Sequence, residues 1–382
     1  MDLLIDRKQI CNILLYLAVL LGFLSYEYTI YRSAYQAILI AVFSLGGLIL
    51  FLGITENKTA LYFYETVKKN MLVYLLSISM LLSTLVSSLK LGLVTYNSIL
   101  SVTLTIMTFY IFFLFIPILL GKDIDKKIKR LCFIITIFSV IGIIIGVNGS
   151  FLGYTPTHFP RVSSVFFDPN YFGTLCALGF ILNINMKGKY KVFALLNIIS
   201  LYFSGSRAAM ISLFIVILIF FFYKKKLKIK TIVSFVSLCL VGYVSLYMLF
   251  EAGYFRLYNG LSSRDYLWEL SFKLIKDQPI WGYGHGAVDE VLQNLGASIG
   301  SSHNAYLDFI IVYGLPTFLL YCMVIMKALY LGAKNNIPQY VLQSTLLLLI
   351  TANSISINLG GLGLTSLLFT LFLGICNAIE HN

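Results

Sequence analysis

The stretch LCFIITIFSVIGIIIGVN, residues 131–148, decides the fold class of this chain. None of its side chains is charged, and its length approaches the roughly 20 apolar residues that a helix needs to cross a bilayer. The preceding segment, KDIDKKIKR at 122–130, is rich in lysine and arginine. Basic residues beside an apolar span are typical of the cytoplasmic side of a membrane. The two segments together predict a membrane-spanning helix that begins at the cytoplasmic face.

The composition of the whole chain extends this prediction. Of its 382 residues, 59% are hydrophobic and 12% are charged, and the mean hydropathy is +0.88. Soluble domains are about half apolar and about a quarter charged. The composition therefore argues against a water-soluble enzyme, a nucleic-acid binder or a disordered scaffold. At roughly 20 residues per span, about twelve spans leave room for loops but for no second soluble domain.

Similar apolar runs recur along the chain. We expect residues 1–382 to form a single all-α, polytopic membrane domain of about twelve transmembrane helices. The first run follows Arg7 and Lys8 as a signal peptide would, but it lacks a small-residue cleavage site, so we expect it to be a retained span. The runs lie at 10–25, 34–53, 71–89, 98–120, 131–148, 171–186, 191–204, 208–223, 231–250, 304–326, 339–357 and 361–379.

The distribution of charge predicts the orientation in the membrane. Lysine and arginine number 28 against 16 acidic residues, which gives a net charge of +12. Such an excess can indicate nucleic-acid binding, but these residues fall mostly in short loops between apolar runs. If the N-terminus is cytoplasmic, 20 of the 28 lie in loops on that side, with a cluster at Lys224–Lys230. This bias predicts that both termini are cytoplasmic. The six cysteines are isolated within apolar runs and predict neither a disulfide framework nor a zinc site.

The longest predicted outer loop, residues 251–302, contains an amphipathic helix. The helix is expected to begin near Ser262 and to end before Pro279, with an apolar stripe opposite its charged residues. Such a helix lies on the membrane surface, packs over the helix bundle, or covers a site beneath it, and the sequence leaves these roles open. The stripe comprises Leu267, Trp268, Leu270, Ser271, Leu274 and Ile275.

Three polar motifs stand where an outer loop enters an apolar run: RVSSVFFDPN at 161–170, SGSR at 204–207 and SSHN at 301–304. Each opens a helix that runs from the outside to the inside, so we expect all three N-termini at the same face. A helix N-terminus carries a partial positive charge and free backbone N–H groups, which favour phosphate binding. The motifs therefore predict a site for a phosphate-containing substrate on the extracytoplasmic side.

The first two motifs combine capping residues with arginines. Asp168 suits a helix N-cap, and Pro169 suits the first helical position. Arg161 and Arg207 are harder to explain, because a cation is unfavourable at the positive end of a helix dipole unless an anion lies nearby. A guanidinium binds phosphate oxygens in a fork and stays charged at any relevant pH. The pair predicts pyrophosphate binding; the alternative is that each arginine reaches lipid headgroups.

The third motif contains a candidate general base. A helix N-terminus and nearby arginines would lower the pKa of His303 and keep its ring able to accept a proton. The alternative is a capping or packed histidine. His285, in WGYGHG at 281–286, competes for the role, although its glycine-rich surroundings predict flexible backbone. Asp308 lies about 140° around the helix from His303, so direct pairing between the two side chains is not expected.

The order of these motifs resembles the O-antigen ligase and polymerase superfamily of bacterial membrane glycosyltransferases, over about 161–317. The elements are Arg161 with Asp168–Asn170, Ser206–Arg207, Arg264 with Trp268, PIWGYG at 279–284, and HNAYL at 303–307 with Gly314 beyond it. The sequence departs from the pattern at Pro316 and at Asp168, which replaces an asparagine often found there.

The resemblance implies the chemistry. The donor would be an undecaprenyl-pyrophosphate-linked oligosaccharide, and the acceptor a second glycan. Arg161 and Arg207 match the family's pyrophosphate-binding arginines, and His303 matches its catalytic histidine. We expect substrate-binding roles for a further set of polar residues. They are Asp168, Asn170, Arg264, His285 and Asn304.

The predicted function is an O-antigen or capsular polysaccharide polymerase on the outer face of the bacterial plasma membrane. It would invert the anomeric centre and use neither metal nor cofactor; a chain-length regulator protein, membrane lipid and the glycan substrates would be its partners, and nucleic acid would not. One alternative is a ligase that transfers the glycan to a lipid A core or a protein. Another is a flippase for lipid-linked sugars, against which stand the lack of an inverted repeat and of midplane ionisable groups.

Overall fold

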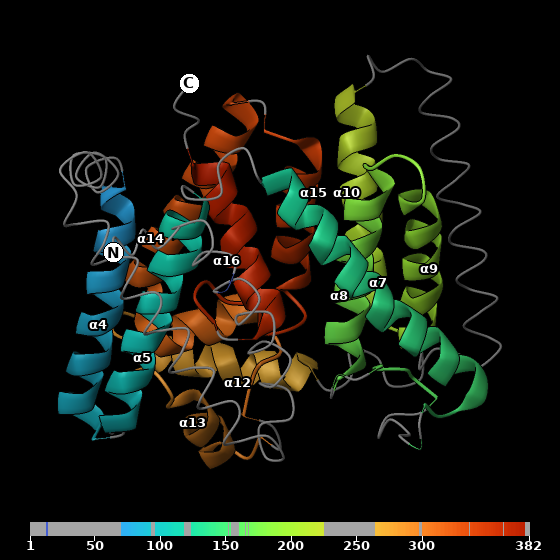
Figure 1. The fold of residues 1–382 in the computed structure, drawn as a ribbon. Coiled ribbons are helices and arrows are strands. Elements are labelled where there is room, and N and C mark those ends of the chain that lie inside the picture. Colours follow the sequence, from blue (N-terminus) through green and yellow to red (C-terminus); the bar gives the residue numbers. More distant parts are fainter. Residues whose placement is uncertain are drawn as a thin grey trace, which may run out of the picture. The chain divides into compact units, whose positions relative to one another are not determined.

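Every regular element in the residues that the computed structural model describes is a helix, which confirms the all-α class (Figure 1). The structure describes residue 13 and residues 70–92, 96–117, 124–151, 153, 160–164, 166, 168–224, 264–297, 300–335, 337–361 and 363–378. Apart from residue 13, the expected spans at 10–25, 34–53 and 231–250 lie outside these ranges, as do 225–230 of the lysine cluster and 251–263 of the long loop. The count of about twelve spans stays a prediction.

The chain divides into two compact units, one formed by Met1–Phe133 with Trp268–Asn382 and the other by Ile134–Leu267. Within the described ranges, four helical stretches are long and apolar enough to cross a membrane. They are Met71–Leu91, Ser98–Phe115, Asp125–Asn148 and Ala305–Lys334. These stretches support the prediction of a membrane protein.

The second unit contains most of α7 (Ile124–Asn148), together with α8 (Pro169–Ile184), α9 (Tyr190–Ser204) and α10 (Arg207–Lys224). Helix α7 begins seven residues before the predicted apolar run. Its first turn carries Asp125, whose charge favours a helix N-terminus, and lysine and arginine are good helix formers, so the helix extends through the basic segment.

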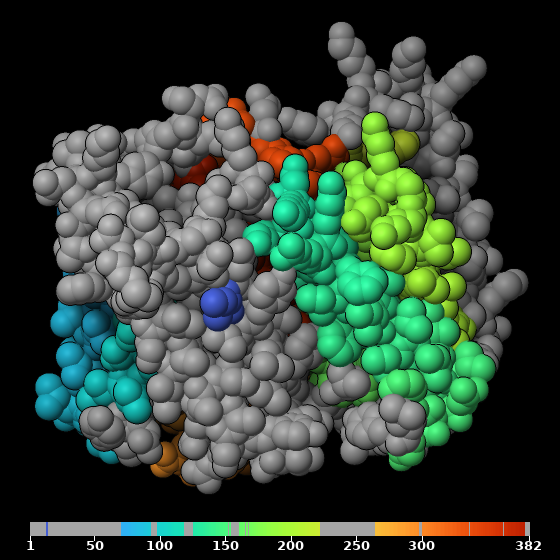
Figure 2. Space-filling model, in the orientation of Figure 1, coloured from blue at the N-terminus to red at the C-terminus, as the bar shows by residue number. Residues whose placement is uncertain are grey.

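Helix α7 presents apolar side chains to the exterior, as expected for a helix that faces lipid. Figure 2 shows its side chains, in blue-green, along the visible face. The exposed residues include Phe133, Ile137, Val140 and Val147.

Polar side chains join α7 to α9 inside the second unit. The Ser139 hydroxyl donates to Asn197 Oδ1 at 2.9 Å, and the Ser200 hydroxyl donates to the Ser139 carbonyl at 2.6 Å. Interhelical hydrogen bonds of this kind stabilise helix association where lipid provides no hydrophobic driving force.

The first unit contains α4 (Met71–Leu91), α5 (Tyr96–Phe109) with the π-helix η2 (Tyr110–Phe115), most of α12 (Arg264–Asp277), α13 (Val288–Asn294), α14 (Ala305–Lys334), α15 (Gln339–Thr351) and α16 (Leu364–Asn377). Helix α4 separates its side chains by polarity: Leu75, Ile78, Leu82 and Leu85 are exposed, whereas Ser83 and Ser87 are buried. Its apolar face suits lipid, and its serines face the protein.

Helix α14 is broken at Gly314, where φ is 78° and ψ is 168°. The segment 279–284 fills the break. Tyr283 N–H donates to the Ile311 carbonyl at 2.8 Å, and Gly284 N–H donates to the Val312 carbonyl at 2.9 Å. In return, Leu315 N–H donates to the carbonyl of Pro279, the first residue of the segment, at 2.8 Å.

The prediction of flexible backbone at 281–286 is therefore wrong. On α4, Ser83 donates its hydroxyl to the Trp281 carbonyl at 2.5 Å, and Ser87 donates to the Gly282 carbonyl at 2.9 Å. Buried irregular backbone is tolerated where the surrounding protein satisfies its polar groups. A Cβ at Gly282 would overlap the carbonyls of Ile311 and Val312, so this glycine allows the segment to pack closely against α14.

The predicted span at 339–357 is also partly wrong, because α15 ends at Thr351. The chain continues without regular helix, and Ile355, Ile357 and Leu359 are buried. The Ala352 carbonyl accepts Ala305 N–H at 2.9 Å, at the start of α14. Burial of these apolar residues and pairing of the backbone explain why an apolar run forms a packed loop.

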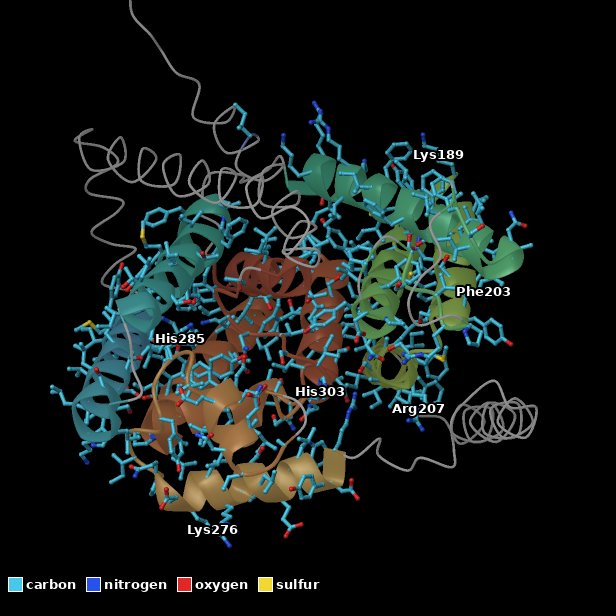
Figure 3. The ribbon with its side chains drawn as sticks, turned by 90° about the horizontal axis from the view of Figure 1, so that it is seen from below. Lys189, Phe203, Arg207, Lys276, His285 and His303 are labelled. Atoms are coloured by element: carbon cyan, nitrogen blue, oxygen red, sulfur yellow. The ribbon has the colours of Figure 1, made fainter. Side chains whose placement is uncertain are left out.

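The amphipathic helix is confirmed as α12, and it packs its apolar stripe on the protein. Leu267, Ser271 and Leu274 are buried, whereas Glu269 and Lys276 are exposed. Figure 3 shows Lys276 pointing away from the protein. Helix α13, within the same predicted loop, is an element that the sequence reasoning missed.

Candidate active site

The polar residues at the start of α8 form a capped turn. Asp168 is the N-cap, and its Oδ1 accepts Asn170 N–H at 2.6 Å, while Pro169 occupies the first helical position. These roles confirm the capping prediction. The side chain of Asn170 also binds the segment before α8, because its Oδ1 accepts a hydrogen bond from Arg161 Nη2 at 2.9 Å.

Arg161 is held between two helices of the second unit. Besides its bond to Asn170, its Nε donates to the Ser204 carbonyl at 3.2 Å, at the C-terminal end of α9. A cation is favourable there because the C-terminus of a helix carries partial negative charge. The backbone follows the same path, since Val162 N–H donates to the Phe203 carbonyl at 3.0 Å. Arg161 thus ties the segment before α8 to the end of α9.

Arg207 and Arg264 carry like charges in one neighbourhood. Arg207 is the first residue of α10 and is labelled in Figure 3; Arg264 is the first residue of α12. Burial, and next the positive charge of Arg207, lower the pKa of Arg264, whereas the Asp168 carboxylate raises it. Two guanidinium groups that repel each other beside helix N-termini make a favourable environment for an anion.

His303 occupies a strained turn just before α14, in the first unit (Figure 3). Its φ is 53°, and Ser164 is the other non-glycine residue with positive φ in the part of the chain that the structure describes. The backbone N–H of His303 donates to Ser301 Oγ at 3.1 Å. Left-handed backbone is uncommon for such residues and is often found at functional sites.

Asn304 follows as the N-cap of α14. Its Oδ1 accepts the N–H groups of Tyr306 at 3.0 Å and Leu307 at 3.3 Å. Asn304, predicted to bind substrate, therefore uses its side-chain oxygen to cap α14. Trp268 on α12 donates from Nε1 to the Ser302 carbonyl at 3.2 Å, so α12 covers this turn, as one of its open roles predicted.

His285 is held by a buried tyrosine. Its Nδ1 lies 2.5 Å from the Tyr313 hydroxyl, and burial lowers the pKa of His285 to about 4. The ring is therefore neutral at physiological pH. The buried Tyr313 hydroxyl needs an acceptor, so we assign Nδ1 as the acceptor and place the ring proton on Nε2.

The sequence reasoning missed several residues that hold the predicted site residues within each unit. It assigned no role to Ser301, Tyr313 or the carbonyl of Ser204, and it gave Asp308 no partner. Ser301 was visible as part of the SSHN motif, but its three hydrogen bonds, to Asp308, Ser356 and His303, depend on the three-dimensional structure. Among the described residues, no three His, Cys, Asp or Glu side chains converge as a metal site.

A comparison with known protein families finds a match for part of the chain. Residues 192–322 match the family described as O-antigen ligase. This match confirms the resemblance to the O-antigen ligase and polymerase superfamily. The matched range contains Arg207, Arg264, His285 and His303, whereas Arg161 precedes it. No curated protein matches the chain.

Proposed function

We propose that the protein is a polysaccharide polymerase of the bacterial plasma membrane. It would join undecaprenyl-pyrophosphate-linked oligosaccharide repeats at the extracytoplasmic face. The observation that carries the proposal is the pair of half-buried arginines, Arg207 at the start of α10 and Arg264 at the start of α12, where burial and next the charge of Arg207 lower the pKa of Arg264 while Asp168 raises it. The match to the family described as O-antigen ligase supports a glycosyltransferase of the ligase or polymerase type.

The arginines bind the pyrophosphate of the donor in this proposal. Negative charge grows on the pyrophosphate as its bond to the anomeric carbon breaks, and cations held in fixed positions stabilise that charge. Arg207 and Arg264 supply this stabilising positive charge, and a bound pyrophosphate relieves their mutual repulsion. Arg161 binds the same pyrophosphate. Its hydrogen bonds to Asn170 and to the Ser204 carbonyl hold its guanidinium in a fixed position. These cations take the role that a metal ion has in other glycosyltransferases, so we propose metal-independent catalysis.

His303 is the general base of the proposed reaction. It removes the proton from an acceptor hydroxyl, whose oxygen attacks the anomeric carbon while the lipid pyrophosphate departs. A direct displacement of this kind inverts the anomeric centre. His285 suits the role less well, because a base with a pKa of about 4 has little affinity for the proton at neutral pH. Its Nε2–H instead suits a donor to a sugar hydroxyl.

A ligase is the second candidate, and the description of the matched family favours it. A ligase would transfer the glycan to a lipid A core or a protein, with the same donor chemistry. The two activities differ in the acceptor alone, so the site residues have the same roles in both. We prefer the polymerase on the resemblance of the motifs, with a chain-length regulator protein as a partner.

The test is incubation of the purified protein with lipid-linked repeats, alone and with a lipid A core, followed by gel analysis. A ladder from the repeats alone supports the polymerase. Product that forms only with the core supports the ligase. Absence of product in both reactions, with protein that still binds the donor, contradicts both candidates.

A further inference from the structure

The buried carboxylate of Asp308 has no role in the reaction described above. Asp308 lies in the first turn of α14 and is 8% exposed. A buried carboxylate is costly unless hydrogen bonds or a cation compensate it. Within the described part of the chain, three groups donate hydrogen bonds to this carboxylate, and they lie in two loops. They are the Ser301 hydroxyl, Ser302 N–H and the Ser356 hydroxyl.

Two of these bonds lead to the turn that contains His303. Asp308 Oδ2 accepts the Ser301 hydroxyl at 2.8 Å, and Oδ1 accepts Ser302 N–H at 2.9 Å. Ser301 Oγ in turn accepts His303 N–H at 3.1 Å. One carboxylate therefore fixes three consecutive residues, and the Ser301 hydroxyl relays its effect to the backbone of His303.

The third bond has a different destination. Ser356, in the loop after α15, donates to Asp308 Oδ2 at 3.4 Å and lies 3.2 Å from the Ser301 hydroxyl. No bond of Ser356 reaches His303 in the described structure. Ser301 and Ser356 thus share the same carboxylate oxygen but differ in their connection to the histidine.

The backbone of His303 needs such support. At φ 53° an L residue is strained, and it keeps this conformation when the surrounding structure imposes it. We propose that Asp308 is a positioning residue, which holds His303 in this conformation through the Ser301–Ser302 turn and so sets the direction of its imidazole. This inference rests on the proposed role of His303 as the base.

Asp308→Asn tests the inference. The asparagine has the same shape but no charge, and one of its two polar atoms donates instead of accepting. In one orientation Ser302 N–H loses its acceptor; in the other the hydroxyls of Ser301 and Ser356 lose theirs, and the bond to Ser301 can form only in reverse. A base misplaced by about 1 Å loses about 100-fold in rate. We expect kcat to fall by about that factor, while the KM for the lipid-linked donor and donor binding stay unchanged. Loss of donor binding together with kcat would indicate general misfolding and overturn the inference.

A matched pair of serine variants keeps the test decisive if Asp308→Asn does not fold. Ser301→Ala should lower kcat about tenfold, in the range that loss of one outer hydrogen-bond partner causes in other sites. Ser356→Ala removes a donor to the same oxygen but should have the smaller effect. Equal losses in the two variants would overturn the relay through Ser301.

Two controls separate this inference from the proposed function. Asp289→Asn removes a neighbouring carboxylate, whose pKa burial and then Asp308 raise, and should leave kcat unchanged. His303→Gln is measured alongside. An active His303→Gln enzyme would contradict the proposed function itself. An inactive His303→Gln enzyme beside fully active Asp308→Asn would contradict the positioning role alone.

Discussion

Replacing Gly314 by alanine should destabilise the first unit strongly. The backbone there has φ 78° and ψ 168°, a region that glycine alone occupies readily, so a Cβ costs about 1–3 kcal/mol in strain. The new Cβ would also overlap the carbonyl group of Ile280. Relief requires the segment 279–284 to move away, which would leave a buried backbone group such as Leu315 N–H unpaired.

An unpaired buried group costs about 1–3 kcal/mol, so the total expected loss is about 2–6 kcal/mol. Gly92→Ala is the matched control. Gly92 also has positive φ, 65°, but a Cβ at this position meets nothing within 4 Å. Its substitution should cost about 1–2 kcal/mol, the strain alone. The assay is the unfolding free energy of each purified variant, from titration of mixed micelles with a denaturing detergent.

The difference between the two variants measures the contribution of the inserted segment. If Gly314→Ala loses no more than Gly92→Ala, the packing of 279–284 into the break of α14 does not stabilise the protein, and this reasoning is refuted.

Four further predictions concern topology, charge, the base and pH. In a cysteine-free background, an impermeant thiol reagent should label Glu269→Cys in intact cells and not Lys225→Cys; labelling of Lys225→Cys would contradict the topology. Arg161→Lys, Arg207→Lys and Arg264→Lys should each lose most product on gels, because a point charge does not replace a fork, whereas Lys225→Ala should retain it; active lysine variants would favour headgroup binding. His303→Gln should lose about 10²–10⁴-fold in kcat and His285→Ala far less, and the reverse result would exchange their roles. The free energy of unfolding should fall as the pH drops from about 6.5 to about 4, because His285 binds a proton in this range in the unfolded protein but not in the folded one. In a pH series of unfolding free energies, His285→Gln should flatten this part of the curve, and an unchanged slope would contradict the lowered pKa of His285.

The sequence predicted the features that depend on local pattern. The apolar runs gave the helices, and the amphipathic period gave α12 from Arg264 to Asp277. Asp168 and Pro169 were recognised as the start of α8 because capping depends on adjacent residues. Arg207 was placed at the start of a helix by the same local reasoning, whereas the contact of Arg161 with the C-terminal end of α9 was not foreseen.

The features that the sequence missed depend on contacts between distant segments. Residues 281–286 were predicted to be flexible because glycine permits both mobility and close packing. The carbonyls of Ile311 and Val312, which accept their N–H groups, lie some 30 residues away in the sequence. The loop after Thr351 read as helix because hydropathy records burial and not backbone conformation. The partners of Asp308 were not predicted, because its donors Ser301 and Ser356 belong to separate loops.

These missed contacts have one consequence in common. The first half of α14, from Ala305 to Tyr313, begins against the Ala352 carbonyl and ends against the inserted segment 279–284, and Asp308 joins its first turn to the loop before it. Each irregular segment pairs its backbone with this half-helix, as burial within a membrane protein requires. The half-helix that follows His303 is therefore fixed at both ends. In the reaction that we propose, a base next to such a support does not move toward a poorly placed acceptor, so we expect discrimination between acceptors to depend on how exactly each presents its hydroxyl.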